Sequence, residues 1–162
     1  MKERFVMKTK ELDRDGNASV LPEDLRQTVG TCALVEMTLE AAQAVGGQLP
    51  RPGAVAEGPI NPRMLLTMLT YCYAAGIYGS EEIEWATDDN PAVRYLCANA
   101  YPDWKTIRRF RRAHRQLIEE CLTGVYGRAC DVKAGGEGNA NLAGFAREKL
   151  EFAVLMDTAM AE

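Results

Sequence analysis

The sequence is poor in the residues that bind transition metals. It has one histidine, His114, and its cysteines form no Cys-x-x-Cys pair. Zinc sites usually draw on several such ligands at short spacings, so no metal site of this kind is expected. The five cysteines are odd in number and widely spaced, which predicts reduced thiols rather than a disulfide framework. They are Cys32, Cys72, Cys97, Cys121 and Cys130.

Long apolar runs and an excess of basic charge are also missing. No run approaches the roughly 20 apolar residues that cross a bilayer, and the start, Met1 to Arg4, does not lead into the apolar stretch of a signal peptide. We therefore expect a cytoplasmic protein without a membrane partner. The 19 Lys and Arg against 23 Asp and Glu give a net charge of −4. This balance excludes a protein that coats nucleic acid with a uniformly basic surface, but it allows a local basic patch.

Two segments resemble ligand-binding loops but lack an essential residue. The run Asp13–Asn17 begins like a calcium loop, yet Ala18 stands where such a loop needs glycine. The glycines of 135–138 are followed by no Gly-Lys-Ser/Thr, which a phosphate loop requires. No Ser/His/Asp or Cys/His set has a supporting motif. We therefore predict no catalytic residue, no metal and no cofactor. An independent enzyme ranks third, behind the two binding hypotheses developed below.

Helix-capping and helix-breaking residues divide the chain, and no strand pattern is evident. A chain of 162 residues with 47% hydrophobic residues suits one ordinary domain. The predicted class is all-α: a helical bundle with a helix-turn-helix-like arrangement and a C-terminal amphipathic helix. The predicted segments are a polar arm over 1–21, a helix over 22–47, a Pro/Gly linker over 48–61, a helical domain over 62–126, a flexible loop over 127–141 and a helix over 142–162.

Within the central domain, the helix starts are marked by their capping residues. Asn61 before Pro62, Ser80, Asn90 before Pro91, and Asp103 are each suited to an N-cap. The residues from Met64 to Ile77 are apolar almost all round, which predicts a buried central helix. Asp103 is expected to start one long basic helix that runs without interruption to about Leu122 or Tyr126.

The basic helix concentrates positive charge. Six of the 19 basic residues fall between Lys105 and Arg115, with no acidic residue among them. At 100° per residue, Ile107, Phe110 and His114 share an apolar side with later residues, and most of the basic residues lie opposite. One interpretation is a helix that docks on DNA, as in helix-turn-helix proteins. The other is a solvated face that pairs with the acidic segments 81–82 and 88–89.

The first interpretation defines the candidate DNA-binding residues. In helix-turn-helix docking, the N-terminal residues of the last helix meet base edges, whereas later basic residues contact phosphates. Base contacts are assigned to Lys105, Arg108 and Arg109, and phosphate contacts to Arg112 and Arg115. Trp104 lies at the same helix end and is either a packing residue or a ligand contact. The complete set is Lys105, Thr106, Arg108, Arg109, Arg112 and Arg115.

Several motifs follow one another in a fixed order between Asn61 and Leu122. They are 61–66 (NPRMLL), 71–80 (YCYAAGIYGS), 82–84 (EIE), 92–96 (AVRYL), 102–107 (PDWKTI) and 109–111 (RFR), followed by His114. With these motifs the segment resembles the N-terminal domain of bacterial insertion-sequence transposases, which precedes a catalytic core of the three-acid type. The resemblance implies a DNA-binding role, with double-stranded DNA as the partner.

The chain departs from that family where the catalytic core would begin. Such transposases continue into an Asp-Gly-Thr motif that supplies the first catalytic carboxylate, but here Asp131 is followed by Val132 and Lys133. Two-metal phosphoryl transfer needs several converging carboxylates. The resemblance therefore implies a transposase-derived DNA-binding protein that lacks catalytic activity.

An alternative is a protein-interaction module that regulates a transposase without binding DNA itself. The apolar residues of the C-terminal helix share one face, which would bury apolar area against a homodimer or transposase partner, or against the chain's own domain. This face comprises Leu142, Phe145, Ala146, Phe152, Ala153, Met156 and Met160.

Overall fold

The structure, a computed structural model, describes residues 24–49, 61–98, 100–134 and 142–160, and within these ranges it is helical without a strand. The all-α prediction is confirmed. The polar arm over 1–21, the calcium-like loop from Asp13, the start of the first helix at Pro22, residues 50–60 of the linker, and residues 135–141 lie outside the described ranges. The elements are α1 Arg26–Val29, α2 Thr31–Val45, the 3-10 turn η2 Gly46–Gln48, α3 Pro62–Ala74, α4 Ser80–Asp89, α5 Pro91–Leu96, α6 Trp104–Ala113, α7 Arg115–Ala134 and α8 Leu142–Met160.

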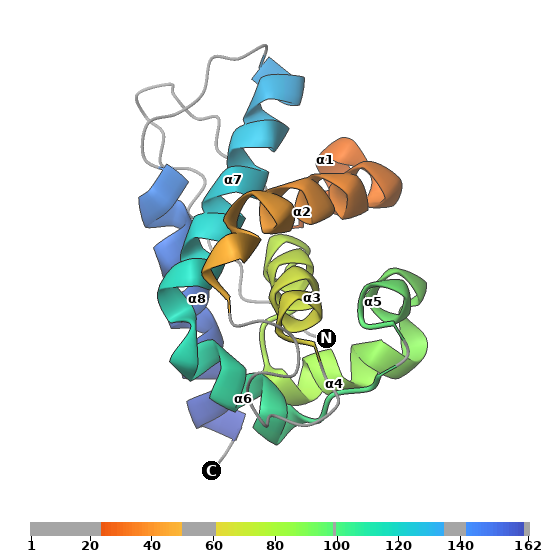
Figure 1. The fold of residues 1–162 in the computed structure, drawn as a ribbon, viewed down its shortest axis with the longest axis vertical. Coiled ribbons are helices and arrows are strands. Elements are labelled where there is room, and N and C mark those ends of the chain that lie inside the picture. Colours follow the sequence, from red (N-terminus) through yellow and green to blue (C-terminus); the bar gives the residue numbers. More distant parts are fainter. Residues whose placement is uncertain (1–23, 50–60, 99, 135–141, 161–162) are drawn as a thin grey trace.

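The helices are arranged around α3 (Figure 1). Helix α7 and helix α8 run antiparallel along one side, and α2 crosses one end of α3. Helices α4 and α5 lie toward the other end, and α6 lies beside the C-terminal end of α8. None of the helices in the described ranges is both long enough and apolar enough to cross a membrane.

Helix α3 is the buried centre of the domain, as the sequence predicts. Every residue from Leu65 to Ala74 is buried, including both tyrosines, Tyr71 and Tyr73. A helix that is apolar on all sides is stable only when other helices cover all of them, and α2, α5, α6, α7 and α8 all pack against it.

Three of the four predicted N-caps are confirmed. Oδ1 of Asn61 accepts a hydrogen bond from the Arg63 amide at 2.8 Å, and Oδ1 of Asn90 accepts one from the Ala92 amide at 3.0 Å. Asp103 accepts one from the Thr106 amide. These side chains satisfy amides that the first turn of a helix leaves without partners.

The fourth cap prediction is wrong. The N-cap of α4 is Gly79, and Ser80 is the first helical residue. The reason is a distant partner: the amide and the hydroxyl of Ser80 both donate to Asp157 of α8, at 2.8 and 2.9 Å. A carboxylate at a helix N-terminus replaces the local cap and is favoured there by the helix dipole.

Two predicted helices are each divided in two. The helix predicted over 22–47 is interrupted at Gly30, whose φ of +90° strains any residue with a Cβ. The long basic helix is interrupted at His114, which has φ −126° and ψ 34° and whose ring packs against Phe110, with ring centroids 4.6 Å apart. This break lets α6 pack against α4 while α7 packs against α2 and α8.

The boundary predicted near Tyr126 is also wrong, because α7 continues to Ala134. Its two glycines lie at helix contacts. A Cβ on Gly124 would lie 3.4 Å from Cβ of Ala41 in α2, and one on Gly127 would lie 4.0 Å from Cδ1 of Leu142 in α8. At Gly124 glycine allows close helix packing, and that packing outweighs its low helix propensity, whereas Gly127 leaves room for a methyl group.

The apolar face of α8 packs against the chain itself. Ala146, Leu150 and Ala153 are buried, and the larger residues Leu142, Phe145, Phe152 and Met156 are partly buried against the same core. The side chain of Met160 lies outside the described part. The face that the interaction-module hypothesis assigned to a partner is therefore covered by α7 and α3.

Candidate nucleic-acid interface

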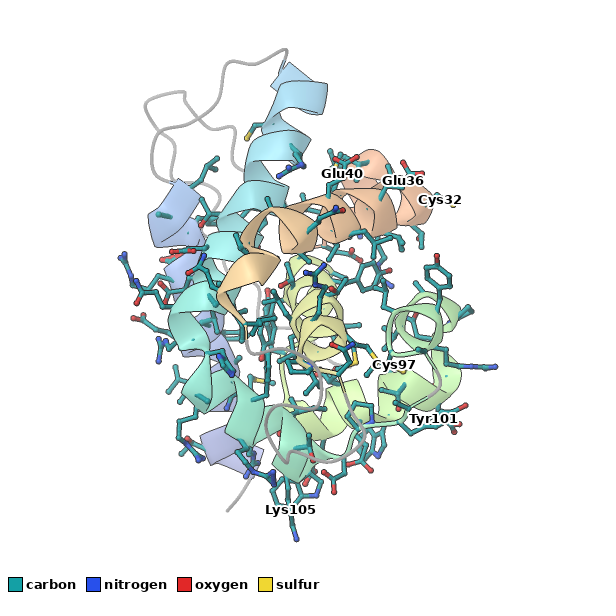
Figure 2. The ribbon with its side chains drawn as sticks, viewed as in Figure 1. Cys32, Glu36, Glu40, Cys97, Tyr101 and Lys105 are labelled. Carbon is teal, nitrogen blue, oxygen red and sulfur yellow. The ribbon has the colours of Figure 1, made fainter. Side chains whose placement is uncertain are left out.

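Helix α6 carries a row of exposed basic side chains on successive turns. Lys105, Arg109 and Arg112 are exposed, and their spacing of four and three residues places them on one side of the helix. None of the three forms an ion pair with any residue in the described ranges. Lys105 projects from the end of the molecule (Figure 2). We call these three residues the basic stripe.

The first turn of α6 is anchored to its neighbours. Besides the Asp103 cap, the amide of Trp104 donates to Oε1 of Glu84 in α4 at 3.0 Å. The half-buried Trp104 ring lies beneath two cations, with Nζ of Lys105 5.5 Å and Cζ of Arg108 4.5 Å from its centroid. These contacts make Trp104 a packing residue that orients the basic side chains around it.

The other side of α6 faces α8, where two arginines converge on one carboxylate. Nη2 of Arg111 lies 2.6 Å and Nε of Arg108 lies 3.4 Å from Oδ2 of Asp157. Nε of Arg108 also donates to the hydroxyl of Ser80 at 3.0 Å, and that hydroxyl in turn donates to Asp157. The carboxylate thus joins the start of α4, the middle of α6 and the end of α8.

Arg111 is unusual because it is a buried arginine, with 7% of its surface exposed. Burial alone would lower the pKa of its guanidinium, but Tyr73 and Asp157 beside it raise that pKa above its usual value. Burial also raises the pKa of the Tyr73 phenol to about 12, although Arg111 acts in the opposite direction. The guanidinium is therefore a fixed positive charge in the domain interior.

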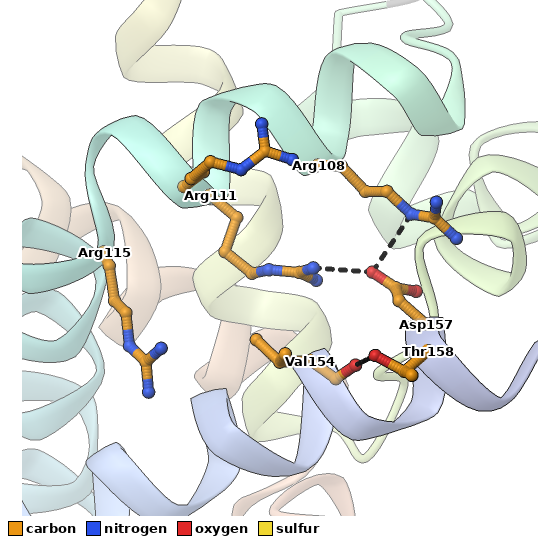
Figure 3. A pocket seen from close by; sticks show the side chains of 7 residues that line it. Arg108, Arg111, Arg115, Val154, Asp157 and Thr158 are labelled. Atoms are coloured by element: carbon orange, nitrogen blue, oxygen red, sulfur yellow. Dashed lines mark hydrogen bonds and ion pairs between the residues drawn. The ribbon is translucent and has the colours of Figure 1, made fainter. Parts of the chain in front are cut away.

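Beside this network lies an open pocket of about 570 Å³. Its wall combines the arginines at the α6–α7 junction with the last turns of α8 (Figure 3). Arg115, the first residue of α7, is also paired with Glu119, whose Oε2 lies 3.5 Å from its Nε. We call this the arginine pocket; its lining is Arg108, Arg111, Arg112, Arg115, Val154, Asp157 and Thr158.

The structure divides five of the six predicted site residues into two groups. Lys105 and Arg109 belong to the stripe alone, Arg108 and Arg115 to the pocket alone, and Arg112 to both. The sixth residue, Thr106, is half-buried in the capped first turn.

Sequence reasoning missed Arg111, Ser80 and Asp157 as parts of this arrangement. A signal was present in α8, where Ala146, Leu150, Ala153 and Asp157 follow one another at helical spacing and are all buried. A carboxylate in line with a buried apolar face requires an interior partner, and arginine is the residue best suited to that role.

The acidic segments of α4 do not neutralise the basic stripe. Neither the 81–82 segment nor the 88–89 segment forms an ion pair with α6 within the described ranges, and Glu84 accepts from a backbone amide of that helix instead. The carboxylate that forms ion pairs with α6, Asp157, contacts its buried side. Within the described residues, the basic stripe is thus left without an ion-pair partner.

No metal centre is formed in the described ranges, where no three His, Cys, Asp or Glu residues come close enough to hold an ion. All five cysteines are free thiols, four of them buried. The side chain of Asp131, which the resemblance compared with the first catalytic carboxylate of insertion-sequence transposases, lies outside the described part.

Comparison with known proteins gives one family match. Residues 33–113 match the family described as Transposase domain (DUF772). The match extends from α2 to the end of α6, so it includes the basic stripe and Ser80 but neither Arg115 nor Asp157. No curated protein and no solved structure gave a significant match.

Proposed function

Because this chain belongs to the DUF772 transposase-domain family, we propose that it binds double-stranded DNA through the basic stripe of α6, as the DNA-docking part of a transposase system rather than its catalytic part. The observation that carries the proposal is the stripe itself. Lys105, Arg109 and Arg112 are three exposed cations on one side of one helix, without an acidic partner in the described ranges.

The geometry of the stripe suits a phosphate backbone. Lys105 and Arg112 are seven positions apart, which is roughly 10 Å along a helix. Phosphates follow one another at about 3.4 Å per strand along the axis of the duplex, so the stripe reaches more than one of them. Each neutralised phosphate releases counterions, which makes binding depend on salt.

The proposal assigns different contacts along the helix. Lys105, in the first turn of α6, and Arg109, in its middle, are the base-reading candidates because their polar groups are exposed. Arg112 contacts a phosphate. Arg108 reaches toward Ser80 and Asp157, so we assign it to the pocket side rather than to a base edge.

The test is fluorescence anisotropy with a labelled random-sequence duplex at two salt concentrations. We expect binding that tightens at low salt, and Lys105→Gln, Arg109→Gln and Arg112→Gln should each reduce the log–log salt slope by about 0.9. Arg94→Gln, which removes an exposed arginine from α5, is the matched control. Absence of binding at low salt, or equal effects of the stripe and control variants, contradicts the proposal.

The non-catalytic part of the proposal rests on the missing Asp-Gly-Thr motif after Cys130. Supercoiled plasmid incubated with the protein and Mg²⁺ or Mn²⁺ is expected to stay intact. Metal-dependent nicking that survives purification to homogeneity, and is lost in Asp131→Asn, contradicts it.

A further inference from the structure

We propose that the arginine pocket between the α6–α7 junction and α8 is a phosphate-binding site, and that it takes a backbone phosphate of the DNA strand lying on the basic stripe. The inference that the phosphate belongs to DNA rests on the proposed function. The inference that the pocket binds a phosphate rests on the pocket alone. The assignment brings α8, which lies outside the family match, into the nucleic-acid interface.

The charge of the pocket favours a phosphate. Four guanidinium groups line it, against a single carboxylate. That carboxylate, on Asp157, accepts from Ser80 through one oxygen and from Arg111 through the other. Glu119 offsets part of the charge of Arg115, so the pocket as a whole keeps an excess of positive charge that an entering anion would neutralise.

The pocket is organised before any ligand arrives. Asp157 and Ser80 hold the guanidinium of Arg108, and Asp157 holds that of Arg111. A wall whose guanidinium groups are already held in place binds an oxyanion without first ordering flexible side chains.

The position and size of the pocket connect it to DNA. Arg112 belongs to both the stripe and the pocket wall, so a strand held by the stripe passes the mouth of the pocket. The volume of about 570 Å³ lies within the range of about 300–1,000 Å³ common for ligand sites. It therefore admits a phosphodiester group together with part of its sugar.

The first experiment separates the pocket from the stripe. Labelled duplex is titrated with the wild type, Arg115→Gln (pocket only), Lys105→Gln (stripe only) and Arg94→Gln (neither). Arg115→Gln should weaken binding several-fold and lower the salt slope by about 0.9, as one lost phosphate contact does. Circular dichroism checks that each variant is folded. Lys105 and Arg94 are exposed and Arg115 is half-buried, so none of the three substitutions removes a core residue.

The outcomes distinguish the two proposals. If Lys105→Gln weakens binding and Arg115→Gln behaves like the control, the pocket inference is overturned and the stripe stands. If only Arg115→Gln weakens binding, the pocket stands and the stripe fails.

The second experiment identifies the source of the phosphate. The Nε–H resonance of Arg108, which lies in the Ser80–Asp157 network, is followed by NMR during titration with duplex DNA and separately with inorganic phosphate, at constant ionic strength. We expect a saturating shift with DNA, and a shift with phosphate at higher concentration. A shift with phosphate alone overturns DNA as the source, and no shift with either ligand overturns the site.

Discussion

The carboxylate of Asp157 and the guanidinium of Arg111 form a buried ion pair, 2.6 Å between Oδ2 and Nη2, across 46 positions of sequence. Both residues are less than a tenth exposed. Breaking such a pair by removing one charge leaves the other uncompensated in the interior, which is far more costly than losing a surface pair.

Asp157→Asn is therefore expected to lower the free energy of unfolding by about 3–5 kcal/mol. Urea denaturation followed by circular dichroism measures the change. Glu151→Gln, which neutralises an exposed acid on the same helix, is the control and should stay within about 0.5 kcal/mol of wild type. Equal midpoints for the two variants would show that the pair contributes nothing to stability.

The cap of α6 makes part of the stability depend on pH. The hydrogen bond from the Thr106 amide holds the pKa of Asp103 below its ordinary value. A lowered pKa in the folded state means that the contribution is complete above about pH 4, the unfolded value, and is lost as the pH falls through the folded value.

Asp103→Ala should cost about 0.5–2 kcal/mol at neutral pH, whereas Asp103→Asn, which still caps, should cost much less. Below pH 4 the difference in stability between the wild type and Asp103→Asn should narrow or reverse. Thermal melts from pH 7 to pH 3 measure both effects, and a gap that is constant with pH argues against the cap.

The thiols should differ sharply in reactivity. Cys32 is exposed on α2 (Figure 2), and the other four cysteines are buried. Burial raises the pKa of the Cys121 thiol to about 11 and that of Cys72 higher still. Since the thiolate is the reactive form, iodoacetamide at neutral pH should add one group to the native protein and five after denaturation, as read by mass spectrometry. Rapid native addition of a second group would contradict the packing around α3.

Two glycines should respond to alanine in opposite directions. In Gly127→Ala the new Cβ finds its nearest neighbour at 4.0 Å, so the gain in helix propensity should raise stability by about 0.5–1 kcal/mol. Gly30→Ala places a Cβ at φ +90° and should lower stability by about 1–3 kcal/mol. Chemical denaturation of both variants side by side measures the difference, and effects of the same sign would contradict these backbone assignments.

The features that local rules govern were predictable from the sequence. Asn61, Asn90 and Asp103 cap their helices because a cap involves only the next few residues. The all-round apolar pattern after Met64 likewise placed α3 at the centre. The chemistry of a short stretch determines these features, whichever partners surround it.

The features that were missed depend on distant partners. No glycine or proline marks the break at His114, which follows from the different neighbours of α6 and α7. The sequence predicts a loop from Gly127 onward, because the packing of α7 against α2 and α8 is visible only when those helices are in place. The candidate site shows the same limit. Helical periodicity grouped Arg108 with the exposed cations, because it does not show the Asp157 carboxylate with which Arg108 pairs.

The burial of α3 on every side makes the order of assembly matter. A helix with apolar side chains all round has no face on which to remain solvated, so a partly assembled domain that leaves it uncovered exposes a large apolar area. Five helices therefore pack against α3, and displacing any one of them exposes part of its apolar surface to water. Unfolding should then proceed as a single cooperative transition, and a long-lived intermediate with α3 uncovered would be prone to aggregate.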